Sequence, residues 1–205
     1  MIAFYCATPY HILVSVNMML NEHKGQPADI YVLNYFDGAK EMVDRLNQCG
    51  LFRRAVFIPV NNYTLYEKIK RFVHVFLPDV RIRQMMRRFD YQVFYFFALD
   101  FLNISYIIKK AMQKRVPCRF CYGEDGIGSY IKDIYVPSEI VSKLLNICGR
   151  TKYLQEIREM YVYAPELVVA NRNFRPMGLK KFNHHDPELA RVCSVLWPHK
   201  ADLKG

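Results

Sequence analysis

The sequence predicts an α/β fold in which a Rossmann-like parallel sheet is flanked by helices. Short apolar runs alternate with longer amphipathic segments, and cap or turn residues separate the two kinds of segment. Strands that alternate with helices form βαβ units, whose right-handed crossovers produce a parallel sheet. A chain of 205 residues is long enough to bury one sizeable core.

The amino-terminal elements carry the clearest signals. Residues 2–6 are a continuous apolar run, which predicts a buried strand. Thr8 and Pro9 then supply the N-cap and the first-turn proline of a helix, which ends near Lys24 and Gly25. The same reasoning predicts strands at residues 29–33, 55–60, 91–97 and 117–122, and helices at residues 39–49, 63–77, 80–88 and 99–114.

The signals weaken in the carboxy-terminal part. A glycine-rich turn is expected at residues 123–128, helices at 138–145 and 152–160, and short strands at 161–163 and 167–170. Residues 176–205 show no clear periodicity and contain several prolines. We therefore expect a Rossmann-like domain at residues 1–175, followed at 176–205 by an irregular tail or the start of an interdomain linker.

The net charge of +10 predicts an anionic partner. Nucleic acid is not expected, because no aromatic-basic recognition module is visible. A solvated face is the default explanation for the basic residues, and contact with the anionic leaflet of an inner membrane is the functional alternative. The basic residues gather in two groups: Lys68, Lys70, Arg71, Arg81, Arg83, Arg87 and Arg88, and then Lys109, Lys110, Lys114, Arg115 and Arg119.

Neither of the two long apolar stretches predicts a membrane span. Residues 1–20 lack a basic flank and are interrupted by Pro9, His11 and Asn17, while Asp100 interrupts residues 91–108. The six cysteines are irregularly spaced, which favours reduced thiols over a disulfide framework. We therefore expect a cytoplasmic protein, with peripheral contact to the inner membrane left open.

Ligands of parallel sheets bind at the carboxyl ends of the strands, and three segments qualify by position: residues 8–11, 34–38 and 123–129. In the third segment, Glu124 and Asp125 lie between glycines (Gly123, Gly126 and Gly128) and are followed by Ser129. Glycines allow a positive φ and close approach of a ligand, and a carboxylate there can act as a general base. A tight Asp-Gly turn is the structural alternative. The glycine spacing is not that of a dinucleotide site.

The segment Thr8, Pro9, Tyr10 and His11 is the second candidate. A helix N-terminus offers N–H groups and partial positive charge to an anion, and His11 can donate a hydrogen bond or move a proton. A well-capped helix with a histidine in its first turn explains the same residues without a ligand.

Neither a metal nor a cofactor is expected. Cys118 and Cys121 form a single CxxC sequence whose side chains point to opposite faces of a strand. His184, His185 and Asp186 lack helical spacing, so a solvated loop is favoured over a metal site. The sequence has no Asp-x-Asp motif of the kind that holds a metal-bound nucleotide sugar.

Two motifs together carry a family resemblance. Residues 5–11, YCATPYH, and residues 122–130, YGEDGIGSY, resemble glycosyltransferase family 52, which contains bacterial lipooligosaccharide and capsule sialyltransferases and is similar to the bacterial polysialyltransferases. The resemblance implies the amino-terminal, acceptor-side half of a two-domain GT-B fold. It also implies inverting, metal-independent transfer of sialic acid from CMP-sialic acid to a glycan hydroxyl. Asp125 would be the general base, with Glu124 and Gly126 shaping the loop.

The sequence also departs from that family. The family's His-Pro motif, which holds the CMP phosphate, is absent, and Pro198-His199 has the reverse order. We therefore expect a glycan acceptor as partner, CMP-sialic acid only if a second domain is supplied, and little transferase activity from this chain alone. The sequence leaves open whether two copies of the chain form a homodimer. The alternatives are a non-catalytic basic module that binds anionic lipid or polysaccharide, and another nucleotide-sugar enzyme that uses residues 8–11 for phosphate.

Overall fold

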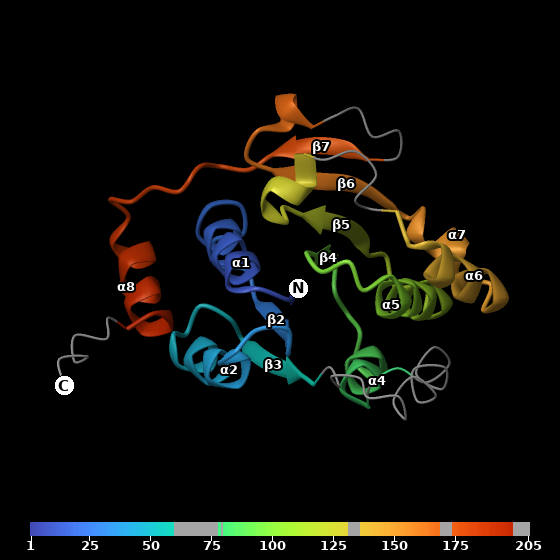
Figure 1. The fold of residues 1–205 in the computed structure, drawn as a ribbon. Helices are drawn as coiled ribbons and strands as arrows, with labels where there is room; N and C mark the ends of the chain where they lie inside the picture. The colour runs from blue at the N-terminus through green and yellow to red at the C-terminus, as the bar shows by residue number, and fades with distance from the viewer. Residues whose placement is uncertain (60–77, 79, 131–135, 169–173, 199–205) are drawn as a thin grey trace.

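The computed structural model describes residues 1–59, 78, 80–130, 136–168 and 174–198. Within these residues, seven strands form one parallel sheet in the order β3-β2-β1-β4-β5-β6-β7 (Figure 1). The strands are β1 (Ile2–Cys6), β2 (Ala28–Leu33), β3 (Arg54–Ile58), β4 (Val93–Phe96), β5 (Arg119–Gly123), β6 (Ile157–Val162) and β7 (Arg175–Gly178). The order 3-2-1-4-5-6 is that of the Rossmann fold, so the predicted fold class is confirmed.

Helices cover both faces of this sheet (Figure 1). One face is covered by α1 (Pro9–Asn21), α2 (Ala39–Gln48) and α8 (Pro187–Leu196). The other is covered by α4 (Val80–Arg87) and α5 (Phe101–Gln113), with α6 (Glu139–Ile147) and α7 (Thr151–Leu154) beside α5. Strands buried on both faces have nearly continuous apolar sequences, and β1 and β2, which are buried at every position, fit this pattern except at Asp29 of β2.

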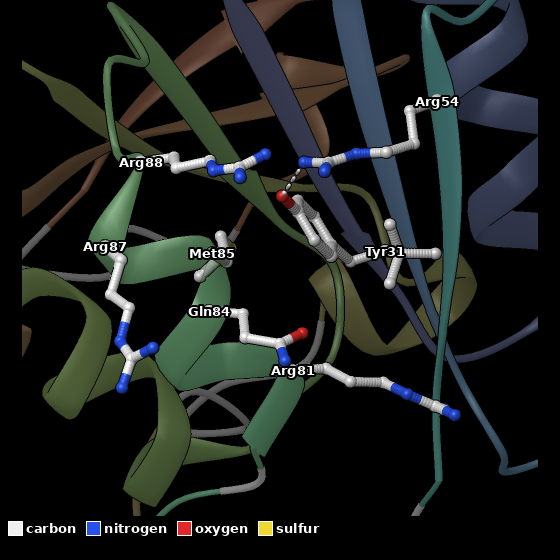
Figure 2. A pocket seen from close by; sticks show the side chains of 8 residues that line it. Tyr31, Arg54, Arg81, Gln84, Met85, Arg87 and Arg88 are labelled. Carbon is white, nitrogen blue, oxygen red and sulfur yellow. Dashed lines mark hydrogen bonds between the residues drawn. The ribbon is translucent and has the colours of Figure 1, made fainter.

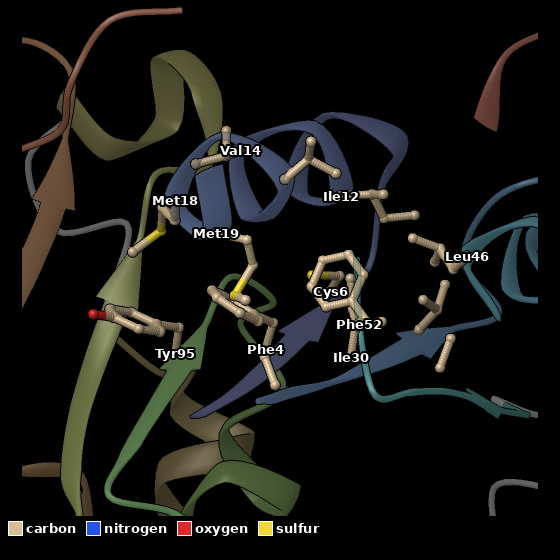
Figure 3. Packing of buried hydrophobic residues seen from close by; sticks show 14 of the residues in the cluster. Phe4, Cys6, Ile12, Val14, Met18, Met19, Ile30, Leu46, Phe52 and Tyr95 are labelled. Atoms are coloured by element: carbon tan, nitrogen blue, oxygen red, sulfur yellow. The ribbon is translucent and has the colours of Figure 1, made fainter. Parts of the chain in front are cut away.

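The core beneath α1 is built from aromatic and aliphatic side chains of the central strands (Figure 3). Phe4 of β1 stacks on Tyr95 of β4 with their ring centroids 5.3 Å apart, and Phe52 meets Phe4 edge-on. Met18 and Met19 of α1 fill the space above these rings. The opposite face has its own core, in which aromatic residues of β4 pack against the isoleucines of α5.

A buried ionic network joins the amino ends of β2, β3 and β4. Asp29 is completely buried and accepts two hydrogen bonds from Arg53, one from Arg54 and one from Tyr91. Burial alone raises the pKa of this carboxyl, but the hydrogen bonds from Arg53 and Tyr91 and the charge of Arg54 outweigh burial and hold the pKa below its ordinary value. A charge inside the sheet is tolerated here because its partners surround it.

Two predictions for the carboxy-terminal elements were wrong. The helix expected at residues 152–160 ends at Leu154, and strand β6 begins at Ile157. The strand expected at 167–170 is, in its described part, the end of a short 3₁₀ helix at Pro165–Leu167, and residues 169–170 lie outside the described residues. Hydrogen bonding to β5 stabilises an extended conformation at residues 157–162 that the local helix propensity opposes.

Irregular structure was also expected beyond residue 175, and this was wrong within the described residues. β7 extends the sheet next to β6, and α8 packs on α1 and α2 (Figure 1). Leu189, Val192 and Leu196 of α8 are buried in the core beneath α1. The helix expected at residues 63–77, the basic residues Lys68, Lys70 and Arg71, and His199 lie outside the described residues. Within the described residues, each helix is too short or too polar to cross a bilayer.

Candidate functional site

Two of the three candidate segments meet at the carboxyl edge of the sheet. The strand order reverses between β1 and β4, and such a switch point is where parallel sheets bind ligands. Residues 8–11 follow β1, and residues 124–130 follow β5, on the other side of β4. The third segment, residues 34–38, follows β2, and β1 and β4 lie between it and β5.

Glu124 is buried and its carboxylate holds three elements together. The side chain is 5% exposed. Oε1 accepts a hydrogen bond from the Tyr10 hydroxyl at 2.5 Å, and Oε2 accepts one from the Tyr130 hydroxyl and one from the Tyr163 N–H, both at 2.7 Å. Burial and the hydrogen bond to Glu124 raise the pKa of Tyr10 above its ordinary range and the pKa of Tyr130 to about 12. Glu124 therefore fixes the loop and does not face an open crevice.

Asp125 is the accessible carboxylate of the pair. Its side chain is 31% exposed, whereas that of His11 is only 2% exposed, and His11 Nε2 lies 2.5 Å from Asp125 Oδ1. The Ala7 N–H donates to His11 Nδ1 at 3.1 Å. Because Nδ1 accepts this bond, the neutral ring carries its proton on Nε2 and donates it to Asp125. The backbone thus sets the tautomer of His11, and His11 orients Asp125.

Part of the glycine-rich loop adopts the positive-φ conformation that its glycines predict. Gly126 has φ of +58°, a region that favours glycine, and opens the 3₁₀ helix η1 (Gly126–Tyr130), which contains Gly128. Ser129 is buried, and its Oγ accepts a hydrogen bond from the Asp125 N–H at 2.7 Å. Ser129 therefore supports the backbone of Asp125 from inside the loop.

The start of α1 contacts the acidic loop of the same chain. Thr8 is the N-cap and accepts from the His11 N–H, and Pro9 is the first helical residue, as the sequence predicts. Tyr10 and His11, in the first turn, each bind one of the two carboxylates. Carboxylates are favoured near a helix N-terminus, so Glu124 and Asp125 occupy the neighbourhood in which an external anion was expected.

Several residues of the site were missed by sequence reasoning. Phe97, directly after β4, stacks on His11 with centroids 5.5 Å apart. Tyr130 and Tyr163 bind Glu124, and Asn17 of α1 donates to the Tyr163 hydroxyl. Tyr163 directly follows β6, so the correct strand assignment would have placed it next to the end of β5.

The described residues contain no group of three or more histidine, cysteine, aspartate or glutamate side chains able to hold a metal ion. Asp186 instead caps α8, because its carboxylate accepts from the N–H groups of Glu188 and Leu189. Cys118 and Cys121 pack on opposite faces of the sheet, as the strand periodicity predicts.

Comparison of the sequence with models of protein families and with curated proteins found no match. The chemistry of the site therefore follows from its geometry. A partly exposed carboxylate, oriented by a buried neutral imidazole and mounted at the carboxyl edge of a Rossmann-like sheet, can accept a proton from a hydroxyl group that approaches from solvent.

Proposed function

We propose that this chain is the acceptor-side part of a sialyltransferase-type glycosyltransferase, with Asp125 as the general base. The observation that carries the proposal is the Asp125–His11 pair, whose exposed member is the carboxylate. The two motifs that carry the family resemblance are the same two segments that meet in this pair. In this proposal the sugar donor, CMP-sialic acid, is bound by a second domain.

The acceptor hydroxyl would approach Asp125 from solvent. As its oxygen attacks the anomeric carbon of sialic acid, its proton passes to a carboxylate oxygen of Asp125, and the bond from the anomeric carbon to the CMP phosphate breaks with inversion. The bond from His11 Nε2 holds Oδ1 and leaves Oδ2 for the incoming hydroxyl. Glu124 positions this loop through its three hydrogen bonds but does not itself exchange protons.

His11 is a poor candidate for the base itself. Its ring is buried, and both nitrogens are already used, Nδ1 as an acceptor from Ala7 and Nε2 as a donor to Asp125. A second proton on Nδ1 would place two donors against each other at Ala7. His11 is therefore assigned a positioning role, through Asp125.

The test is titration of the isotope-labelled chain with lactose and with a sialylated lactose, followed by NMR. We expect chemical-shift changes centred on residues 8–11 and 124–130, and binding should persist in Asp125→Asn, which keeps the shape of the side chain. Asp37→Asn, an exposed acid after β2, is the matched control.

Transfer is then measured with a complementing donor domain and CMP-sialic acid. Asp125→Asn should lower the rate at least 100-fold, within the range for loss of a general base, while Asp37→Asn leaves it unchanged. Absence of shift changes at the loop, or full activity of Asp125→Asn, would refute the proposal.

A second candidate function is binding to anionic lipid, and one observation favours it. Helix α6 exposes Ile140 and Ile147, 73% and 70% accessible, which lie about one turn before and one turn after half-buried Leu144 on the same side of the helix. Lys143 lies beside this apolar stripe. Lys143 is ion-paired with Glu139 at 2.6 Å, and an exposed apolar stripe beside a lysine is a feature of surfaces that lie on membranes.

Vesicle flotation with phosphatidylglycerol separates this function from the first. Ile140→Ser combined with Ile147→Ser should release the protein from vesicles, whereas Asp125→Asn should not. Binding that is unchanged in the double variant, or absent from acidic vesicles at low salt, would eliminate the lipid function and leave the glycan titration unaffected.

A further inference from the structure

A cationic cavity lies between the edge strand β3 and helix α4, away from the Asp125–His11 pair. Its volume is about 390 Å³, within the usual range for small-molecule sites. It is lined by Tyr31, Arg54, Val56, Arg81, Gln84, Met85, Arg87 and Arg88 (Figure 2). Among the described lining residues, four are arginines and none is acidic. Of these arginines, Arg54 is ion-paired with Asp29, which does not line the cavity, and like charges at such a site favour the binding of an anion.

Arg54 keeps part of its hydrogen-bonding capacity for a ligand. Its Nη2 donates to Asp29 Oδ2 at 2.8 Å and to the Tyr31 hydroxyl at 3.1 Å, and these bonds use neither Nε nor Nη1. Arg53 already forms two hydrogen bonds with Asp29, so a single carboxylate charge is shared by two guanidinium groups. The ionic network behind the cavity is therefore positively charged overall.

The Tyr31 hydroxyl has no proton left to donate to a ligand. The Tyr91 hydroxyl donates to Asp29, so in the 2.6 Å contact between the two hydroxyls Tyr31 is the donor. Its one proton is thus committed to Tyr91, and its oxygen accepts from Arg54. The donors that the cavity presents to a ligand are consequently the guanidinium groups of Arg54 and Arg88 and the Gln84 amide, a set suited to an acceptor-rich anion.

Two arginines meet at the upper end of the cavity. Figure 2 shows the guanidinium groups of Arg88 and Arg54 pointing toward each other beside the Tyr31 hydroxyl. Arg88 forms no hydrogen bond or ion pair with a side chain of the described residues. At the lower end, Arg81 is held in place by a 2.5 Å hydrogen bond to the Phe57 carbonyl and by its position over the Phe57 ring.

We propose that this cavity binds a phosphoryl group carrying at least two negative charges, held between Arg54 and Arg88 and supported by Gln84. Guanidinium groups bind phosphate oxygens in pairs, and the planar fork of arginine makes such contacts stronger and more directional than lysine does. The cavity is larger than a single phosphate requires, so it has room for a pyrophosphate or for the rest of a phosphorylated molecule. The site is independent of the proposed transferase function.

The test is calorimetric titration of the whole chain with inorganic pyrophosphate at low salt. We expect binding that weakens with added salt, because exposed charges are screened. Arg88→Gln should weaken it about tenfold or more, the loss expected for one charge-assisted hydrogen bond, and Arg88→Lys should weaken it less. Arg83→Gln is the matched control, because Arg83 is an exposed arginine of the same helix that does not line the cavity.

The two sources of such a phosphoryl group are separated by a second arm, cosedimentation with vesicles that contain phosphatidic acid. A lipid headgroup site predicts vesicle binding that Arg88→Gln abolishes, and a soluble phosphorylated ligand predicts pyrophosphate binding without dependence of vesicle binding on Arg88. The proposal is overturned if pyrophosphate does not bind at millimolar concentration, or if Arg83→Gln weakens binding as much as Arg88→Gln does. Circular dichroism of each variant checks that it remains folded.

Discussion

The ring of Phe97 occupies the space that any side chain at Gly123 would need. A β-carbon on Gly123 would lie well inside contact distance of the Phe97 ring carbons. The same ring stacks on His11. Phe97 follows β4, between the ends of β1 and β5, so one aromatic side chain sets the spacing between the two halves of the candidate site.

We expect Gly123→Ala to destabilise the protein by about 1–3 kcal/mol, the usual cost of overpacking. Urea unfolding of the variant measures this change. Adding Phe97→Leu should restore part of the loss, because the smaller side chain makes room for the new methyl group, and Phe97→Leu alone provides the reference. A midpoint for Gly123→Ala equal to that of the unmodified protein would contradict the close contact.

The two adjacent acids should differ in their contribution to stability. In Glu124→Gln the amide nitrogen would face hydroxyl or N–H donors that now bind a carboxylate, which should cost about 2 kcal/mol or more. Asp125→Asn should cost less, about 1 kcal/mol or below, because Asp125 is partly exposed. Urea unfolding compares the two variants directly. The reverse order would show that Asp125, and not Glu124, supports the fold.

His23 should make the protein less stable in mild acid. Burial, together with the positive charge of Arg119, lowers the pKa of His23 from its ordinary value of 6.5, and its Nε2 forms a 2.9 Å hydrogen bond with the Tyr95 hydroxyl. The unfolded chain therefore binds a proton at a higher pH than the folded protein does. The contribution of neutral His23 to stability is fully present above about pH 6.5 and declines as the pH falls below that value. Urea unfolding at about pH 7.5 and about pH 5 measures the decline.

His23→Gln is the variant that isolates this effect, since glutamine keeps a polar partner for Tyr95 and does not titrate. Its loss of stability between the two pH values should be smaller than that of the unmodified protein. An identical loss would assign the pH dependence to other groups.

Leu196→Ala should destabilise the protein by about 2–5 kcal/mol. Leu196 is fully buried where α8 packs on α1 and α2, and truncating a buried leucine leaves a cavity. Leu167→Ala is the control, because Leu167 is 64% exposed and its truncation should change stability by less than about 0.5 kcal/mol. Thermal or urea unfolding distinguishes the two, and similar small effects would mean that α8 is not part of the cooperative core.

Much of the sheet could be predicted from the sequence because its central strands are continuous apolar runs. β1, β2, β4 and β5 were located to within a few residues for this reason. Residues 157–160 of β6 were assigned to a helix, and only its end was expected as a strand, since the charged residues Arg158 and Glu159 interrupt its apolar pattern and the surrounding residues are good helix formers. Pairing with β5, which is distant in sequence, decides the conformation there.

The helix α8 could have been predicted, and was not. Asp186 and Pro187 form an N-cap and first-turn proline, and Leu189, Val192 and Leu196 follow at helical spacing. For the site, the pairing of residues 8–11 with 124–125 follows from strand order, which local patterns do not specify. The burial of Glu124 and the exposure of Asp125 depend on Tyr10, Tyr130 and Tyr163, which approach from three separate elements.

The position of α8 has a consequence for biosynthesis. The chain leaves β7 at one edge of the sheet and returns across the molecule to rest on the first two helices (Figure 1). Arg191 of α8 donates a hydrogen bond to the Cys49 carbonyl, and Arg45 of α2 donates one to the Leu196 carbonyl, so hydrogen bonds also join the two helices. Because a ribosome releases residues in order, the surfaces of α1 and α2 that pack against α8 stay uncovered until α8 has been made. Nascent chains that stall before α8 emerges should therefore expose apolar surface and tend to aggregate. Chaperones should bind them longest just before α8 emerges.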